Sequence, residues 1–236
     1  MFCGQVKGLV KSHVVPQALH KDVQPEDDVM TMYSNTRSWG KKSPTGTYGQ
    51  FLCQDCESHV GRDDQYGIEF VREYKDGRTG TPLGSFGEGF IADVDYAKLK
   101  LWVMSMLWRA DACSHEFYKR VNLGEKWRRN LTKSIRLRKP GCIDYFAVTA
   151  TLFDEKDDKE DYGQITMAAP HRVNMFGFNW YRFYVYGGFT FFIKVDQRKL
   201  PDELARYALR KDEPFTILRR KFSNGEREAF RQLTSG

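Results

Sequence analysis

The sequence predicts an α+β protein in which a small N-terminal ββα module precedes helices and an antiparallel β-sheet domain. Cys3 and the pair Cys53 and Cys56 enclose a short apolar strand that carries His13, a pattern typical of a small fold stapled by zinc. Apolar residues then recur at three- and four-residue spacing over 96–107, which indicates a buried helix. From residue 143 the pattern changes to aromatic-rich, partly alternating runs, which indicate strands.

The first 75 residues are expected to form the ββα module. Pro16 ends the first strand, and a polar segment over 21–47 predicts a variable, substrate-facing loop. A strand over 48–52 leads into Cys53, and a helix is expected from near Cys56 toward Arg72. Residues 76–92 contain many glycines and a proline and predict a linker to a second domain over 93–236.

The second domain is expected to begin with two helices. The helical pattern starts at Asp93, which is a suitable N-cap, and its apolar residues fall between Tyr96 and Leu107. A further helix over 124–136 has an apolar side formed by Trp127, Leu131 and Ile135. The other expected elements are strands at 143–153, 164–167, 176–186, 188–195 and 215–221, helices at 201–209 and 226–233, and a tight turn at Gly187–Gly188.

The candidate zinc ligands are Cys3, Cys53 and Cys56, because two thiolates three residues apart can reach one ion from a strand-to-helix turn. A structural zinc takes four ligands, and a cysteine that formed a second C-x-x-C pair with Cys3 would have to precede Met1. The fourth position therefore stays open: either the start is misassigned, or His20 or another residue completes the site, or no zinc binds. The alternative for the pair is two reduced core thiols or a redox couple. The remaining cysteines, Cys113 and Cys142, have no partner at metal spacing and are expected to be buried free thiols.

The number of cysteines and the hydropathy of the chain favour a cytoplasmic location. Five cysteines, an odd number, together with the C-x-x-C pair favour a reducing environment over a disulfide framework. No apolar run reaches membrane-spanning length, and His13, Pro16 and His20 interrupt the region where a signal peptide needs an apolar core. We expect a soluble cytoplasmic protein with no membrane partner.

Three stretches carry a resemblance to a known family. They are Cys3 to Pro16, which reads C-G-x-x-x-G-L-x-x-S-H-x-x-P, then Leu52 to Glu57, which reads L-C-x-x-C-E, and Ser105 to Arg109, which reads S-x-L-W-R. The first 70 residues resemble the HNH (ββα-metal) endonuclease superfamily, and the three stretches together are similar to a group of bacterial HNH-like proteins. The resemblance implies a zinc-stapled ββα fold that hydrolyses phosphodiester bonds in nucleic acid with a divalent cation.

The resemblance also implies roles for individual residues. His13 matches the general base that activates water, and imidazole suits that role because its pKa lies near neutrality. Glu57 matches a ligand of the catalytic cation, Mg²⁺ or Mn²⁺, with His59 or Asp63 as further candidates. Ser12 stands where the family has Asp or Glu, and it is a much poorer metal ligand.

The basic residues are distributed unevenly. The formal net charge is +6, and seven cations fall in one stretch with a single acid. These candidate nucleic-acid-binding residues are Lys126, Arg128, Arg129, Lys133, Arg136, Arg138 and Lys139. Such a stretch can contact several phosphates and release their counterions, and the alternative is a solvated helix face. A smaller cluster, 219–221, follows near the C-terminus.

Three functions are compatible with these residues. The leading hypothesis is a metal-dependent HNH-like endonuclease acting on nucleic acid, with DNA as the expected substrate, and the resemblance suggests a role in phage defence. The second is a catalytically inactive HNH-like scaffold that binds nucleic acid or a partner protein in a defence or anti-defence complex. The substitution at Ser12 and the missing cysteine favour the second. The weakest is a redox protein that uses Cys53 and Cys56 with a depressed thiol pKa.

Overall fold

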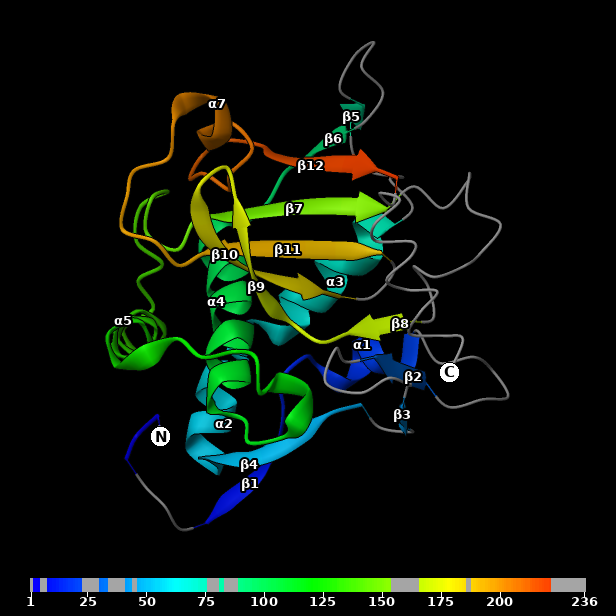
Figure 1. Cartoon of the computed structure of the whole chain (residues 1–236), viewed down its shortest axis with the longest axis vertical. Helices are drawn as coiled ribbons and strands as arrows, with labels where there is room; N and C mark the ends of the chain where they lie inside the picture. The colour runs from blue at the N-terminus through cyan, green and yellow to red at the C-terminus, as the bar shows by residue number, and fades with distance from the viewer. Residues whose placement is uncertain are drawn as a thin grey trace.

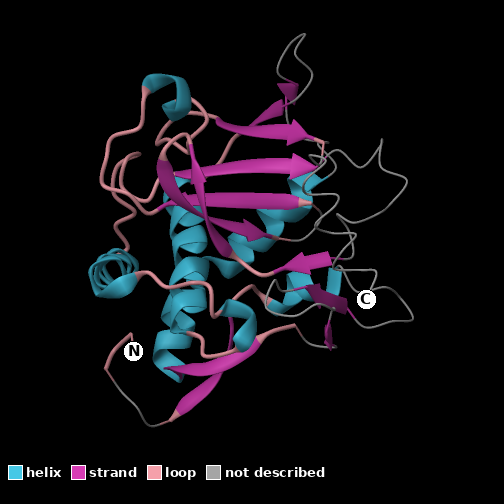
Figure 2. Ribbon diagram, viewed as in Figure 1, coloured by secondary structure: helices cyan, strands magenta, loops and turns pink. Residues whose placement is uncertain are grey.

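The chain forms a mixed α+β architecture in which one buried helix separates an N-terminal hairpin from a large sheet (Figures 1 and 2). The computed structural model describes residues 2–4, 8–22, 30–33, 41–43, 46–75, 81–82, 89–153, 166–185 and 188–221. The expected helix at 226–233 and the first residue of the expected tight turn, Gly187, lie outside these residues.

The N-terminal elements follow the expected ββα order. Strand β1 (Leu9–His13) pairs antiparallel with β4 (Tyr48–Cys53), and helix α2 (Gln54–Val60) follows directly. A 3-10 turn, η1 (Gly61–Asp63), leads into α3 (Asp64–Lys75). The helix begins at Gln54 rather than near Cys56, because Cys53 has extended backbone angles and occupies the N-cap position.

The segment expected as a loop contains regular structure. Helix α1 (Gln17–Asp22) extends into it, and β2 (Met30–Tyr33) and β3 (Lys41–Ser43) pair with each other inside it. Strand β2 also pairs in parallel with β8 (Thr166–Ala168), which is more than 130 residues later in the chain. A parallel partner so distant in sequence leaves no local pattern, so the loop prediction was wrong here.

Helix α4 (Tyr96–Ala112) is the central element. Asp95 is its N-cap and accepts a hydrogen bond from the Lys98 amide at 3.0 Å. The expected cap, Asp93, is two residues too early. All residues from Leu99 to Ala110 are buried, because the hairpin, α3, the sheet and helix α5 (Gly124–Leu137) surround the helix (Figure 1).

A seven-stranded sheet forms the upper half of the molecule in Figure 1, in the order β5-β6-β12-β7-β11-β10-β9. Its strands are β5 (Thr81–Pro82), β6 (Gly89–Ala92), β7 (Val148–Phe153), β9 (His171–Met175), β10 (Phe178–Tyr184), β11 (Phe189–Lys194) and β12 (Phe215–Arg220). Strand β12 runs parallel to β7, so the sheet is mixed rather than wholly antiparallel. Short elements complete the fold, namely η3 (Glu116–Tyr118) and α7 (Asp202–Ala205).

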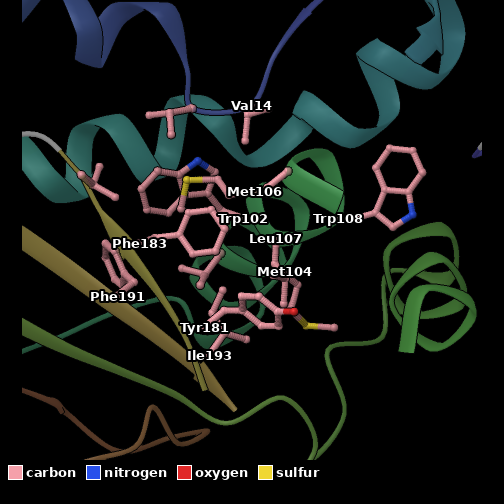
Figure 3. Packing of buried hydrophobic residues seen from close by; sticks show 14 of the residues in the cluster. Val14, Trp102, Met104, Met106, Leu107, Trp108, Tyr181, Phe183, Phe191 and Ile193 are labelled. Atoms are coloured by element: carbon pink, nitrogen blue, oxygen red, sulfur yellow. The ribbon is translucent and has the colours of Figure 1, made fainter. Parts of the chain in front are cut away.

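Residues on both sides of the expected linker belong to one hydrophobic core. A single cluster of buried side chains runs from Phe2 to Ile217, and Trp102 packs its ring edge-on against Phe191 with centroids 5.6 Å apart (Figure 3). Gly67 lets α3 approach α4, because a Cβ there would lie 2.1 Å from the Trp102 ring. Strand β6 falls within the range 76–92 and pairs with β12, so this part of the expected linker is a strand of the sheet.

Candidate metal centre and nucleic-acid interface

Three cysteine thiols meet where the hairpin joins α2. Cys3 precedes β1, Cys53 ends β4, and Cys56 lies in the first turn of α2. Their sulfur atoms all lie within 4.8 Å of one another, and the Sγ atoms of Cys3 and Cys53 are 3.7 Å apart. Three sulfurs at such separations match the donor set that Zn²⁺ prefers in structural sites.

Electrostatics around the thiols also favours a cation. Burial and the neighbouring thiols of Cys3 and Cys53 raise the pKa of Cys56 well above its ordinary value. Thiolates this close together need a positive ion between them, because they repel one another. A redox couple requires the opposite shift, since the attacking thiol is activated by a depressed pKa.

The fourth ligand is not His20. Leu9 pairs with Cys53 at one end of the hairpin, and His13 pairs with Tyr48 at the other. His13 thus lies roughly 13 Å along the strand from the thiol end, at about 3.3 Å per residue. The His20 ring packs near His13, with centroids 6.3 Å apart. Among the described residues, the three thiols have no further His, Cys, Asp or Glu ligand beside them.

Ser12 and His13 lie on opposite faces of β1, because successive side chains of a strand alternate. Ser12 is completely buried and its hydroxyl donates to the Val10 carbonyl at 3.4 Å. His13 is half-buried, with its ring centroid 5.8 Å from that of Tyr48. The structure therefore places the Ser12 hydroxyl on the face of β1 opposite His13, with the Val10 carbonyl as its partner.

A second imidazole, that of His20, lies next to His13, and this contact was not predicted from the sequence. His20 lies in α1 and is 3% exposed. It can pack this closely because Gly46 has no side chain: a Cβ at Gly46 would lie 2.5 Å from the ring. Burial, followed by the charge of His13, lowers the pKa of His20 to about 4. Its seven-residue spacing from His13 would have indicated the contact only if α1 had been predicted.

Acid should destabilise the protein through His20. The unfolded chain protonates this residue near pH 6.5, whereas the folded chain does so only near pH 4. The unfolded state therefore binds more protons in this window, and stability falls as the pH decreases through it, by at most about 3 kcal/mol. Urea unfolding at pH 7 and pH 4.5 should show a larger loss in the wild type than in His20→Gln. Equal losses of stability in the two proteins would show that His20 does not cause the destabilisation in acid.

The three candidate ligands of the catalytic cation, Glu57, His59 and Asp63, do not converge on one point. Asp63 accepts two hydrogen bonds from Arg138, at 2.5 and 2.8 Å, and is 4% exposed. His59 directs Nε2 at the Ile135 carbonyl, 3.1 Å away. Glu57 lies near Asp64, whose pKa is raised by burial and, among smaller causes, by the charge of Glu57. Asp63 and His59 thus contact α5 and the residue that caps it, and no group of three or more such ligands forms here among the described residues.

The S-x-L-W-R stretch has a structural role. Arg109 is 1% exposed and donates to Asp64 at 2.9 Å, which ties α4 to α3. Trp108 donates to the Thr132 hydroxyl at 2.8 Å and packs edge-on against Phe2, with centroids 5.1 Å apart. These contacts join the N-terminal module, α4 and α5, and the Asp64–Arg109 ion pair was not predicted from the sequence.

Helix α5 exposes most of the predicted basic residues. Arg128 forms an ion pair with the buried carboxylate of Asp111, Arg129 pairs with Glu125 at 2.6 Å, and Arg138 pairs with Asp63. The other four cations, Lys126, Lys133, Arg136 and Lys139, are exposed and form no ion pair with any described residue. The prediction of nucleic-acid contacts therefore rests chiefly on these four, and Arg138 serves the fold.

A shallow groove follows the exposed side of α5. Its volume is about 610 Å³, and its described lining includes Arg129, Lys133 and Arg136, together with Leu137, which is 53% exposed. The second basic cluster, at 219–221, lies at the end of β12, far from α5 (Figure 1). The two clusters do not form one surface.

The structure also bears on the two remaining cysteines and on the expected absence of a membrane-spanning helix. Cys113 is buried as expected, but Cys142 is exposed, because it lies in the turns between α5 and β7. No helix in the described part of the chain has both the length and the apolar character needed to cross a bilayer. Comparison with protein-family models, curated proteins and solved structures gave no match to this chain.

Proposed function

We propose that the protein is a zinc-stabilised HNH-like module that binds nucleic acid through α5. The convergence of Cys3, Cys53 and Cys56 at the strand-to-helix junction carries this proposal, because it is the arrangement that the resemblance implies for a structural zinc in a ββα fold. Zinc bound there would fix the start of α2 against the N-terminal stretch and β4.

The contacts between the module and α5 link the metal centre to the basic surface. His59 lies in the last turn of α2 and Asp63 follows that helix closely, and they contact the Ile135 carbonyl and Arg138 near the end of α5. The exposed cations of α5 are thereby held on a rigid helix whose other side is buried against α4. Positive charges fixed in position bind a phosphate backbone without distinguishing its sequence.

The endonuclease is the second candidate, and one observation favours it. His13 keeps partial exposure at the end of β1, where the resemblance places the general base. Ser12, Asp63 and His59 are engaged in other contacts, so three of the four residues that the resemblance offers as cation ligands are already bound within the fold. For this reason we rank binding without cleavage first.

A cleavage assay separates the two candidates. Purified protein and His13→Ala are incubated with supercoiled plasmid, single-stranded DNA and RNA, in Mg²⁺, Mn²⁺ or EDTA. We expect gel-shift binding by both proteins and no metal-dependent cleavage by either. Nicking that needs Mg²⁺ or Mn²⁺ and disappears in His13→Ala would establish the endonuclease instead, and absence of binding to every substrate would contradict both.

A further inference from the structure

A largely apolar pocket of about 420 Å³ lies on the outer face of the large sheet, opposite α4 and next to α7 (Figure 1). Trp180 and Phe192 form part of its floor on β10 and β11, and Leu204 and Tyr207 contribute a wall from α7 and the turn after it. A cavity of about 150 Å³ with apolar walls is large enough to bind benzene. The pocket therefore has room for a phenyl ring.

A strained and exposed aromatic residue borders this pocket. Phe176 and Gly177 form the two-residue loop between β9 and β10, and their φ angles are 54° and 78°. A hairpin loop with two positive φ angles favours Asn-Gly, and it is unfavourable for a bulky side chain. Phe176 is nevertheless 75% exposed, more than any other large hydrophobic residue in the described part of the chain. One position thus combines a strained backbone with a phenyl ring in water.

The exposed ring and the pocket are neighbours on one face, which is the arrangement that a symmetric dimer requires. In a two-fold dimer the same patch of each copy meets itself, so a protruding residue must lie beside the hollow that receives its equivalent. Phe176 borders the pocket, and the half-buried apolar residues Met175, Leu204 and Leu218 line it. A small molecule would use the pocket alone, whereas a second copy of this chain uses both the pocket and the ring.

We propose that two copies of this chain associate through this face as a two-fold dimer, with Phe176 of each copy in the pocket of the other. The incoming ring then leaves water and packs against Trp180 and Phe192, which accounts for an aromatic residue at a strained turn. Arg182 and Arg220 of the lining stack on aromatic rings of their own chain, and the proposal assigns them no role. It depends neither on zinc nor on α5.

Analytical ultracentrifugation of the full chain, freed of nucleic acid, tests the dimer. We expect a reversible monomer–dimer equilibrium at micromolar concentration that persists in high salt, because burial of apolar surface is not screened by ions. Phe176→Asn should weaken dimerisation by at least about 100-fold, since two aromatic anchors are lost per dimer and each contributes at least about 10-fold. Leu137→Asn removes another exposed apolar side chain, on α5, and should leave dimerisation unchanged.

A mixing experiment shows whether the ring and the pocket meet each other. Thr149→Phe adds a ring on the pocket floor, from β7, and leaves Phe176 in place. Each of the variants Phe176→Asn and Thr149→Phe should be monomeric alone. An equimolar mixture of the two regains one of the two ring-to-pocket contacts, because the first keeps an open pocket and the second keeps the ring. We therefore expect a heterodimer of intermediate affinity from the mixture.

Urea unfolding separates loss of the contact from misfolding. Asn-Gly suits the turn better than Phe-Gly, so the urea midpoint of Phe176→Asn should exceed that of the wild type at concentrations where both are monomeric. A monomeric wild type, unchanged dimerisation or a lower midpoint in Phe176→Asn, or a mixture without heterodimer when both variants have native circular dichroism would overturn the proposal. Binding of the neutral dye Nile red by a monomeric wild type would assign the pocket to a small molecule instead.

Discussion

Replacing Cys53 with serine is expected to remove the bound metal and to destabilise the protein by about 5 kcal/mol. Structural zinc contributes about 10–16 kcal/mol of apparent binding free energy in small zinc-finger peptides. The loss is expected to be smaller here because Phe2, Phe51 and Val60, which surround the thiols in sequence, also belong to the large core shared with α4. The residual thiols of Cys3 and Cys56 cannot complete a three-sulfur site.

Cys142→Ser is the matched control. Its thiol is exposed and lies outside the cluster, so its replacement should change neither metal content nor the urea midpoint. The wild type treated with a strong chelator should resemble Cys53→Ser, and added Zn²⁺ should restore only the wild type. Equal stability of Cys53→Ser and Cys142→Ser, with no response to chelator, would show that the cluster is not a structural metal site.

Neutralising three exposed cations of α5 is expected to weaken nucleic-acid binding by about 100-fold at low salt. The variant replaces Lys126, Lys133 and Arg136 with alanine, and it spares Arg128 and Arg138 because their partners Asp111 and Asp63 are buried. Each phosphate contact contributes about 0.9 to the slope of log affinity against log salt on duplex DNA. Three lost contacts should therefore reduce that slope by between about 2 and 3.

The control variant also loses three positive charges, but from a surface away from α5. Lys199, Arg206 and Lys211 are exposed and lie in or beside the segment around α7, and their replacement by alanine should leave the slope unchanged. Fluorescence anisotropy with a labelled duplex between 50 and 300 mM salt measures both proteins. If the two triple variants lose affinity equally, binding follows net charge alone and α5 is not the interface.

Much of the architecture could be predicted because its signals are local. The apolar spacing of Leu99, Trp102 and Leu107 identified α4, and the apolar side of α5 identified that helix. The order strand, strand, helix around Cys53 also follows from neighbouring residues. The position of the α4 N-cap differed by two residues, because Asp93 and Asp95 are both suitable caps and only tertiary contacts select between them.

The elements that could not be predicted depend on distant partners. Strand β6 is only four residues long and follows a glycine-rich stretch, so its pairing with β12 leaves little local signal, and β2 pairs with β8 across the chain. The parallel pairing of β12 with β7 requires knowledge of where the chain returns after α7. Residues in such strands read as loop or linker when their partners are unknown.

The candidate site shows the same division between local and distant signals. The spacing of Cys53 and Cys56 predicted that they would share a site, and the structure brings Cys3 to them. The opposite orientation of Ser12 and His13 follows from strand alternation alone and could have been predicted. The engagement of Asp63 by Arg138, a partner 75 positions away, could not, because no local pattern shows that α5 packs against η1.

X-ray absorption at the zinc K-edge, on protein purified without added metal, tests the central claim most directly. The account predicts one zinc per chain with three sulfur neighbours at about 2.3 Å and a lighter fourth neighbour, and no zinc in Cys53→Ser. Protein without metal, or a metal with no sulfur neighbours, would contradict the zinc-stapled ββα module.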